Sequence, residues 1–346
     1  MGAIVGGMRP TAAALAAASV LLLAACSGSS ATPTPVPATA LASAGAGPET
    51  ASAPQCAPDS QPTATVYAGW PQPGRAQASG DMIPLLVSSQ ITAGPSRFLF
   101  SLIDSTNAVL AAADVPVTVA FFDLAADPAT PVATVDGAYL DPGTGRGLYR
   151  ASVDFRCTGE WGVVVTAGLA SGEVTSRVIF EVAPSGTVPV IGAPAPRSDS
   201  PVGTTPEEIA LISTDDDPDP DFYAQSIAGA VTSGKPSAIL FATPQFCQTA
   251  TCGPMLDLME TIAADFKDTV TFVNVEPYRL RETDLGLQPD LDANGSLQPV
   301  PSVVDWGLPT EPYLFIVDAD GLITASFEGI LGEDEVRAAL MDVSDT

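Results

Sequence analysis

Short apolar segments recur through one long stretch of the chain. Between about residues 77 and 183, β-branched segments follow one another at intervals of roughly 8–12 residues, separated by turn residues. No convincing helical period accompanies them, so the pattern predicts an antiparallel sandwich or barrel. The expected strands are Arg97–Asp104, Val115–Leu124, Val132–Leu140, Gly147–Phe155, Gly159–Leu169 and Glu173–Val182.

The pattern changes near residue 207, where helical and extended segments begin to alternate, as they do in an α/β domain. The clearest helix is expected to follow Cys252 and to end near Lys267, with one apolar face formed by Met255, Met259, Ile262 and Phe266. Further helices are expected at Glu207–Ile212, Phe222–Val231 and Glu333–Met341. The expected strands are Ser237–Ala242, Val270–Val275, and a hairpin of Tyr313–Asp318 with Leu322–Phe327.

The start of the chain has a third pattern, an apolar run from Thr11 to Ala25 preceded by a single charge, Arg9. This run is shorter than the ~20 residues that a membrane-spanning helix needs. A basic start, a short apolar run and small residues at its end indicate a secretory signal. The segment that follows, to about Thr65, is rich in Ser, Thr, Ala and Pro, and such a composition predicts a disordered tether.

Charge and composition exclude several classes of function. The chain has 40 acidic residues, 13 basic residues and no histidine, which gives a net charge of −27. Without histidine there is no Ser-His-Asp triad and no His-ligated zinc or copper site. Binding to nucleic acid is not expected, because phosphate contacts need clustered cations. The reactive inventory is therefore reduced to five cysteines.

The first cysteine closes the apolar run as Leu23-Ala24-Ala25-Cys26, which resembles the lipobox of bacterial lipoproteins. The resemblance implies that Cys26 is lipid-modified and becomes the mature N-terminus, so that the protein is anchored on the extracytoplasmic face of the cell membrane. The alternative is an ordinary signal peptide with an incidental cysteine. In an extracytoplasmic compartment disulfides form and persist.

The C-terminal region resembles the thioredoxin-like superfamily, and within it the membrane-tethered thiol–disulfide oxidoreductases. Segments in the family's order carry the resemblance: a strand at residues 234–243, Cys247 and Cys252 before a helix, and the run Trp306-Gly307-Leu308-Pro309-Thr310-Glu311-Pro312. The resemblance implies that Cys247 and Cys252 are the catalytic thiols and that Pro312 is the cis-proline of a substrate groove. It implies no cofactor and no metal. The implied partners are protein thiols or disulfides near the membrane and a membrane electron donor or acceptor.

Two departures from the family pattern leave alternatives open. Four residues separate Cys247 from Cys252, where the family has two, and no acidic residue stands within Ile239-Leu240-Phe241. Cys252 is nearer the helix N-terminus, which lowers a thiol pKa, but Cys247 is slightly favoured as the attacking thiol. A non-catalytic binding lipoprotein with a structural Cys247–Cys252 disulfide is the second hypothesis. A thiol peroxidase is the third and weaker hypothesis. Thr243 lies shortly before Cys247, but the spacing between the two residues is not that of peroxiredoxins.

The remaining cysteines, Cys56 and Cys157, are expected to form a structural disulfide between the tether and the β domain, an inference from counting alone. The acidic run at residues 215–221 could bind calcium, but a proline-stiffened surface turn is favoured. The run at residues 290–295 resembles the start of an EF-hand loop and is discounted, because Pro301 stands where the bidentate Glu should be and no flanking helices are expected.

The expected organisation is a signal peptide at 1–25, a tether at 26–76, an immunoglobulin-like β-sandwich at 77–184, a proline-rich linker at 185–206 and a thioredoxin-like α/β domain at 207–346. The sandwich resembles, in pattern only, small β domains of other extracytoplasmic bacterial proteins. Trp161 is expected in its core.

Overall fold

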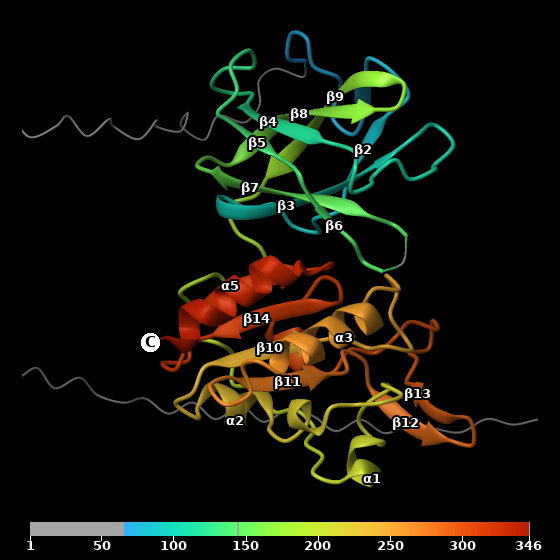
Figure 1. The fold of residues 1–346 in the computed structure, drawn as a ribbon, viewed down its shortest axis with the longest axis vertical. Coiled ribbons are helices and arrows are strands. Elements are labelled where there is room, and N and C mark those ends of the chain that lie inside the picture. Colours follow the sequence, from blue (N-terminus) through green and yellow to red (C-terminus); the bar gives the residue numbers. More distant parts are fainter. Residues whose placement is uncertain (1–65, 144, 346) are drawn as a thin grey trace, which may run out of the picture. The chain divides into compact units, whose positions relative to one another are not determined.

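A computed structural model describes residues 66–143 and 145–345 (Figure 1). The expected signal peptide, the tether up to residue 65, Cys26 and Cys56 lie outside the described residues. Within the described ranges, no helix has both the length and the apolar character to cross a membrane. The described structure is rich in β-strands, has few helices and contains several antiparallel sheets.

The first part of the chain forms two antiparallel sheets. One has the strand order β1 (Ala76–Ala78), β9 (Gly172–Val182), β8 (Gly159–Leu169), β4 (Val117–Asp123) and β5 (Ala133–Asp136). The other has the order β2 (Ile83–Leu86), β3 (Gly94–Ile103), β7 (Leu148–Phe155) and β6 (Ala138–Leu140).

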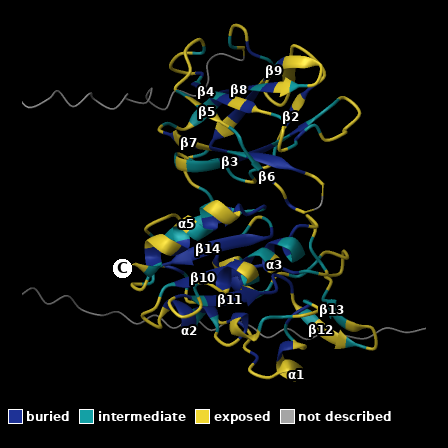
Figure 2. Cartoon of the chain, viewed as in Figure 1, coloured by how far each residue is buried: buried dark blue, intermediate teal, exposed yellow. Residues whose placement is uncertain are grey.

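The two sheets share one aromatic core. Buried residues alternate with more exposed ones along β7, as expected when one face of a strand is covered (Figure 2). Phe155 packs edge-on against Trp161 and Phe121, with ring centroids 4.9 and 5.6 Å away. Trp161 is 1% exposed and its indole N–H donates to the Cys157 carbonyl at 2.9 Å. Trp161 is therefore a core residue, as the sequence predicts.

The segment expected as one strand, Val132–Leu140, is two strands in different sheets. The chain changes sheet at Gly137, whose N–H donates to the Val117 carbonyl at 2.8 Å. An added Cβ at Gly137 would lie 3.3 Å from the Val117 side chain, so the crossing backbone passes close to β4. The period of two continues through the crossing, which is why the sequence pattern does not reveal it.

The second part of the chain is built on a four-stranded sheet with the order β11 (Thr271–Val275), β10 (Ser237–Phe241), β14 (Tyr313–Val317) and β15 (Ile323–Glu328). β10 pairs parallel with β11 and antiparallel with β14, and β14 pairs antiparallel with β15. Every residue of β10 and β14 is buried. Both faces of this sheet must therefore be covered.

Alternate side chains of β10 and β14 point to opposite faces of the sheet, and different helices cover the two faces. Leu240 and Leu314 belong to a core shared with α3 (Cys252–Ala263) and α5 (Glu333–Ser344). Ile239 and Phe315 belong to a second core shared with α2 (Ile227–Val231) and with Trp306, which directly follows α4 (Pro301–Asp305). The apolar face expected for α3 is buried at Met255, Met259 and Ile262.

Other elements differ from the expectation. The helix expected at Phe222–Val231 is a 3-10 turn, η1 (Pro220–Phe222), followed by the separate helix α2. The first ends at Tyr223, and Ser226 starts the second, because its hydroxyl accepts from the Gly229 N–H at 3.1 Å and caps α2. The helix at residue 207 is short, α1 (Pro206–Ile209). The hairpin of β12 (Leu280–Thr283) and β13 (Gly286–Pro289), and α4, carry little apolar periodicity and were not expected.

Candidate functional site

Cys247 and Cys252 form a disulfide at the turn from β10 into α3, with their Cα atoms 5.9 Å apart. Cys252 is the first residue of α3 and is fully buried, whereas Cys247 lies on the preceding loop and is partly exposed. The preceding Thr251 makes no side-chain cap to the helix. The first amide groups of α3 are therefore available to the cysteine loop.

The N-terminus of α3 donates a hydrogen bond to the Cys247 sulfur. The Cys252 N–H donates to the Cys247 sulfur at 3.2 Å, and the Thr249 hydroxyl also lies 3.2 Å from that sulfur. An N–H donor at a helix N-terminus favours a thiolate over a thiol. The loop thus folds back and places the Cys247 sulfur at the N-terminus of α3, where the sequence alone placed only Cys252.

The predicted Pro312 lies beside this loop, and the Glu311–Pro312 peptide bond is cis. The Glu311 carbonyl accepts from the Thr249 hydroxyl at 3.1 Å. The Glu311 carboxylate accepts from the Gln248 N–H at 2.9 Å. The structure therefore brings together Cys247, Cys252 and the segment that carries Pro312.

Glu311 is a member of this site that the sequence analysis did not name. The residue is 6% exposed, and one of its carboxylate oxygens lies within 4.8 Å of both cysteine sulfurs. The Tyr278 hydroxyl is hydrogen-bonded to Glu311 and accepts from the Gln248 side-chain amide at 2.6 Å. Burial raises the pKa of Tyr278 to about 12, so its hydroxyl keeps its proton near neutral pH. The only sequence signal for Glu311 is its place directly before Pro312.

A cavity of about 300 Å³ adjoins the site. Its walls come from the cysteine loop, from the segment after β11 and from the segment around α4, and they are mostly apolar or proline side chains. They include Gln248, Pro277, Tyr278, Pro299, Val303 and Leu308, together with Glu311. Cys247 does not line this cavity, but its neighbour in the chain, Gln248, does.

A second buried acid, Glu276, follows β11 directly and is 6% exposed. Its carboxylate accepts from the Thr214 N–H at 2.7 Å and from the Thr214 hydroxyl at 2.6 Å. Thr214 also accepts from the Gln245 N–H of the cysteine loop at 3.3 Å. Burial raises the pKa of Glu276. A buried acid thus lies directly after the strand that neighbours β10, and Thr214 connects it to the cysteine loop.

The acidic turn at residues 215–221 packs against α3. The Asp219 N–H donates to the Glu260 carboxylate at 3.1 Å. Burial, together with the charges of Asp215, Asp219 and Asp257, raises the pKa of Glu260 to about 7, although the Asp219 N–H opposes the rise.

We expect Glu260→Gln to stabilise the protein above neutral pH. The folded-state pKa of about 7 exceeds the ordinary 4.5, so the stability that Glu260 contributes is fully present below about pH 4.5 and is lost as pH rises through 7. Because Glu260 is only half-buried, screening limits the gain in unfolding free energy at pH 8 to roughly 1–2 kcal/mol. Denaturant unfolding at pH 4 and pH 8 measures it, with the exposed Glu282→Gln as the control. Equal gains at both pH values would contradict the prediction.

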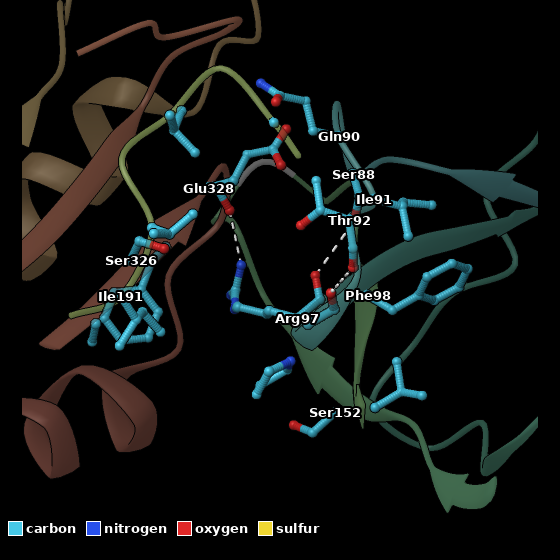
Figure 3. Close-up of a pocket in the computed structure, with 18 of the residues that line it drawn as sticks. Ser88, Gln90, Ile91, Thr92, Arg97, Phe98, Ser152, Ile191, Ser326 and Glu328 are labelled. Carbon is cyan, nitrogen blue, oxygen red and sulfur yellow. Dashed lines mark hydrogen bonds between the residues drawn. The ribbon is translucent and has the colours of Figure 1, made fainter. Parts of the chain in front are cut away.

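A larger cavity, of about 860 Å³, lies between β3, β15 and the segment at residues 186–191 (Figure 3). Arg97 crosses it toward Glu328, and its guanidinium donates to the Glu328 carbonyl at 2.8 Å. No cysteine lines this cavity, so it is separate from the disulfide site.

The other predicted site residues are not brought to this site by the described structure. Cys157 lies between β7 and β8 and is disulfide-bonded. Its predicted partner Cys56 lies outside the described residues, so that pairing stays a prediction. The same holds for the lipid anchor at Cys26.

No family model matches the chain, and no curated protein matches its sequence. Among solved structures, one described as MTB dsbF in its mixed oxidized and reduced forms is 22% identical and covers 35% of this chain and 89% of that chain, with a TM-score of 0.25. The PmoD soluble domain from Methylocystis sp. ATCC 49242 (Rockwell) is 17% identical over 30% of this chain and 92% of its own, with a TM-score of 0.20. The PKD domain of human SorCS2 is 14% identical over 39% of this chain and 95% of its own, with a TM-score of 0.19. These similarities are distant and assign no function to the chain.

Proposed function

We propose that this protein is a membrane-anchored, extracytoplasmic thiol–disulfide oxidoreductase that exchanges disulfides with protein substrates. The observation that carries the proposal is the environment of Cys247. Cys247 is partly exposed, its sulfur accepts a hydrogen bond from the first amide of α3, and it forms a disulfide with the fully buried Cys252. One accessible and one protected sulfur are what sequential attack and resolution require.

The chemistry needs only the two thiols. In the reducing direction, the Cys247 thiolate attacks one sulfur of a substrate disulfide, and the other substrate sulfur leaves as a thiolate. Cys252 then attacks Cys247, which releases the second substrate thiol and re-forms the Cys247–Cys252 disulfide. A membrane electron donor returns two electrons to the pair. In the oxidising direction the same steps run in reverse toward a membrane acceptor.

The domain organisation is part of the proposal. Residues 207–346 form a thioredoxin-like domain whose cis Pro312 shapes the substrate groove beside the sulfurs. Residues 77–184 form an immunoglobulin-like sandwich that is joined to it by a proline-rich linker. The segment at 26–76 tethers both to the membrane through lipid on Cys26, and the Cys56–Cys157 disulfide fixes the tether to the sandwich.

One observation favours the alternative of a non-catalytic binding protein with a structural disulfide. The Glu311 carboxylate lies within 4.8 Å of both sulfurs, and a negative charge there opposes formation of a thiolate. The two proposals differ in how readily the disulfide is reduced.

The reduction potential of the Cys247–Cys252 pair tests the proposal. Equilibration of the protein with graded dithiol and disulfide mixtures, followed by mass spectrometry of alkylated peptides, is expected to give a potential above about −300 mV. A value well below that would assign the bond a structural role. Glu311→Gln removes the opposing charge, so it should raise the potential by at least about 30 mV, equivalent to ~1.4 kcal/mol. Glu260→Gln, on the same helix as Cys252, is the matched control.

A further inference from the structure

We propose that the reduced pair and Glu311 form a redox-gated Zn²⁺ site, with Cys247, Cys252 and Glu311 as ligands and water in the fourth position. The inference shares with the proposed function only the requirement that the disulfide can be reduced. Two thiolates and one carboxylate are a donor set that suits Zn²⁺, and none of the three ligands is a histidine.

The spacing of the three donor atoms fits a tetrahedral ion. The two sulfurs and one Glu311 oxygen all lie within 4.8 Å of one another. With Zn–S distances of about 2.3 Å and Zn–O distances of about 2.0–2.2 Å, ligand atoms on a tetrahedral ion are roughly 3.5–4 Å apart. Opening the disulfide moves the sulfurs from bonding distance toward that separation, so a small adjustment of the loop completes the site.

The carboxylate is already held in place as a ligand would be. The Gln248 N–H donates to Glu311 at 2.9 Å, and the Tyr278 hydroxyl is hydrogen-bonded to the same side chain. Such partners orient a ligating carboxylate and leave its remaining lone pairs for the ion. Glu311, Tyr278 and the cysteine loop come from three separate segments, yet they converge on one point.

The charge of Glu311 also calls for a cation. Glu311 is 6% exposed as a residue, and the ion pairs found among the described residues do not include its carboxylate. A buried charge without a charged partner is costly. In the oxidised protein only hydrogen bonds compensate it, whereas Zn²⁺ in the reduced protein would neutralise both it and the two thiolates.

Binding would be gated by oxidation state. A dithiol reductant transfers two electrons and two protons to the disulfide and is itself oxidised to a disulfide. Zn²⁺ then displaces the two thiol protons and binds the thiolates. The adjoining cavity of about 300 Å³, which Gln248 and Glu311 line, would hold the fourth ligand. Bound metal keeps Cys247 from attacking a substrate. Re-oxidation by a disulfide oxidant, which takes up the two electrons and is reduced to a dithiol, re-forms the Cys247–Cys252 bond and expels the ion.

Titration of Zn²⁺ into the phosphine-reduced full chain, followed by calorimetry, tests the site. One ion per chain and blocked reaction with a thiol reagent are expected in the reduced protein, with no binding in the oxidised protein. Glu311→Gln should weaken binding at least tenfold and Tyr278→Phe by about 10–100-fold, while Glu260→Gln should leave it unchanged. A cooperative thermal unfolding transition of each oxidised variant shows that it folds.

Two results would overturn the site: equal Zn²⁺ binding by oxidised protein, or binding by the reduced protein that is unaffected by Glu311→Gln. Neither depends on catalysis. Disulfide exchange without Zn²⁺ binding would remove the metal site alone, and Zn²⁺ binding without exchange would remove the proposed function alone.

Discussion

Cys252→Ser is expected to trap the protein as a stable mixed disulfide through Cys247, and Cys247→Ser is expected to abolish exchange without forming any adduct. The asymmetry follows from burial and hydrogen bonding. Cys252 is fully buried, so it cannot reach a substrate disulfide. Cys247 is partly exposed, and the Cys252 N–H that donates to its sulfur belongs to the backbone, so it survives the serine substitution.

Mass spectrometry of each variant after incubation with a disulfide-bonded peptide measures the adduct. The rate of alkylation by iodoacetamide provides a second measurement: the thiol at 247 should react much faster than the thiol at 252. Loss of turnover should be complete in both variants, because each removes one of the two sequential attacks. An adduct on Cys252, or equal alkylation of the two thiols, would reverse the assigned roles.

The sequence pattern predicted those strands and helices in which a single hydrophobic period continues without a break from one turn to the next. β8 occupies Gly159–Leu169, the bounds expected, and the apolar face of α3 is the face that is buried. The pattern failed where a change of partner left the period intact, as at Gly137, where the chain passes between sheets. It also failed between Phe222 and Ile227, where a 3-10 turn ends at Tyr223 and the Ser226 hydroxyl begins a new helix.

The site was predictable only in its sulfurs and its proline. The chain has only five cysteines, and Cys247, Cys252 and Pro312 stand at recognisable places in the order of elements. Glu311 and Tyr278 stand in no recognisable motif, and they meet the cysteine loop only after three segments have folded together. Glu276 could have been noticed as an acid directly after an apolar strand, but no spacing in the sequence shows that Thr214 and the cysteine loop would meet it.

Removal of Arg97 is expected to lower the free energy of unfolding more than removal of any other charged residue, because its guanidinium makes several hydrogen bonds and a buried ion pair. Arg97 stands on β3, and its Nε donates to the Glu335 carboxylate of α5 at 2.9 Å while its guanidinium also donates to the Glu328 carbonyl. The described residues all belong to one compact unit, Pro54–Thr346. The ion pair joins β3 to α5, and the hydrogen bond to Glu328 joins β3 to β15, within that unit.

Replacing Arg97 by Met should destabilise the protein by about 3 kcal/mol, the lower end of the cost of breaking a buried pair, because Arg150 still lies 3.2 Å from Glu335. The side chains of Arg97 and Glu335 are 14% and 7% exposed, so the carboxylate left behind is poorly solvated. Arg97→Lys should fall between, since a single ammonium cannot reproduce the forked contact. Arg281→Met is the control: its partner Asp290 and its own side chain are exposed, and exposed pairs contribute less than about 1 kcal/mol. Denaturant unfolding followed by tryptophan fluorescence measures all three variants. Equal losses of unfolding free energy for Arg97→Met and Arg281→Met would show that the buried Arg97–Glu335 pair does not hold β3 and α5 together.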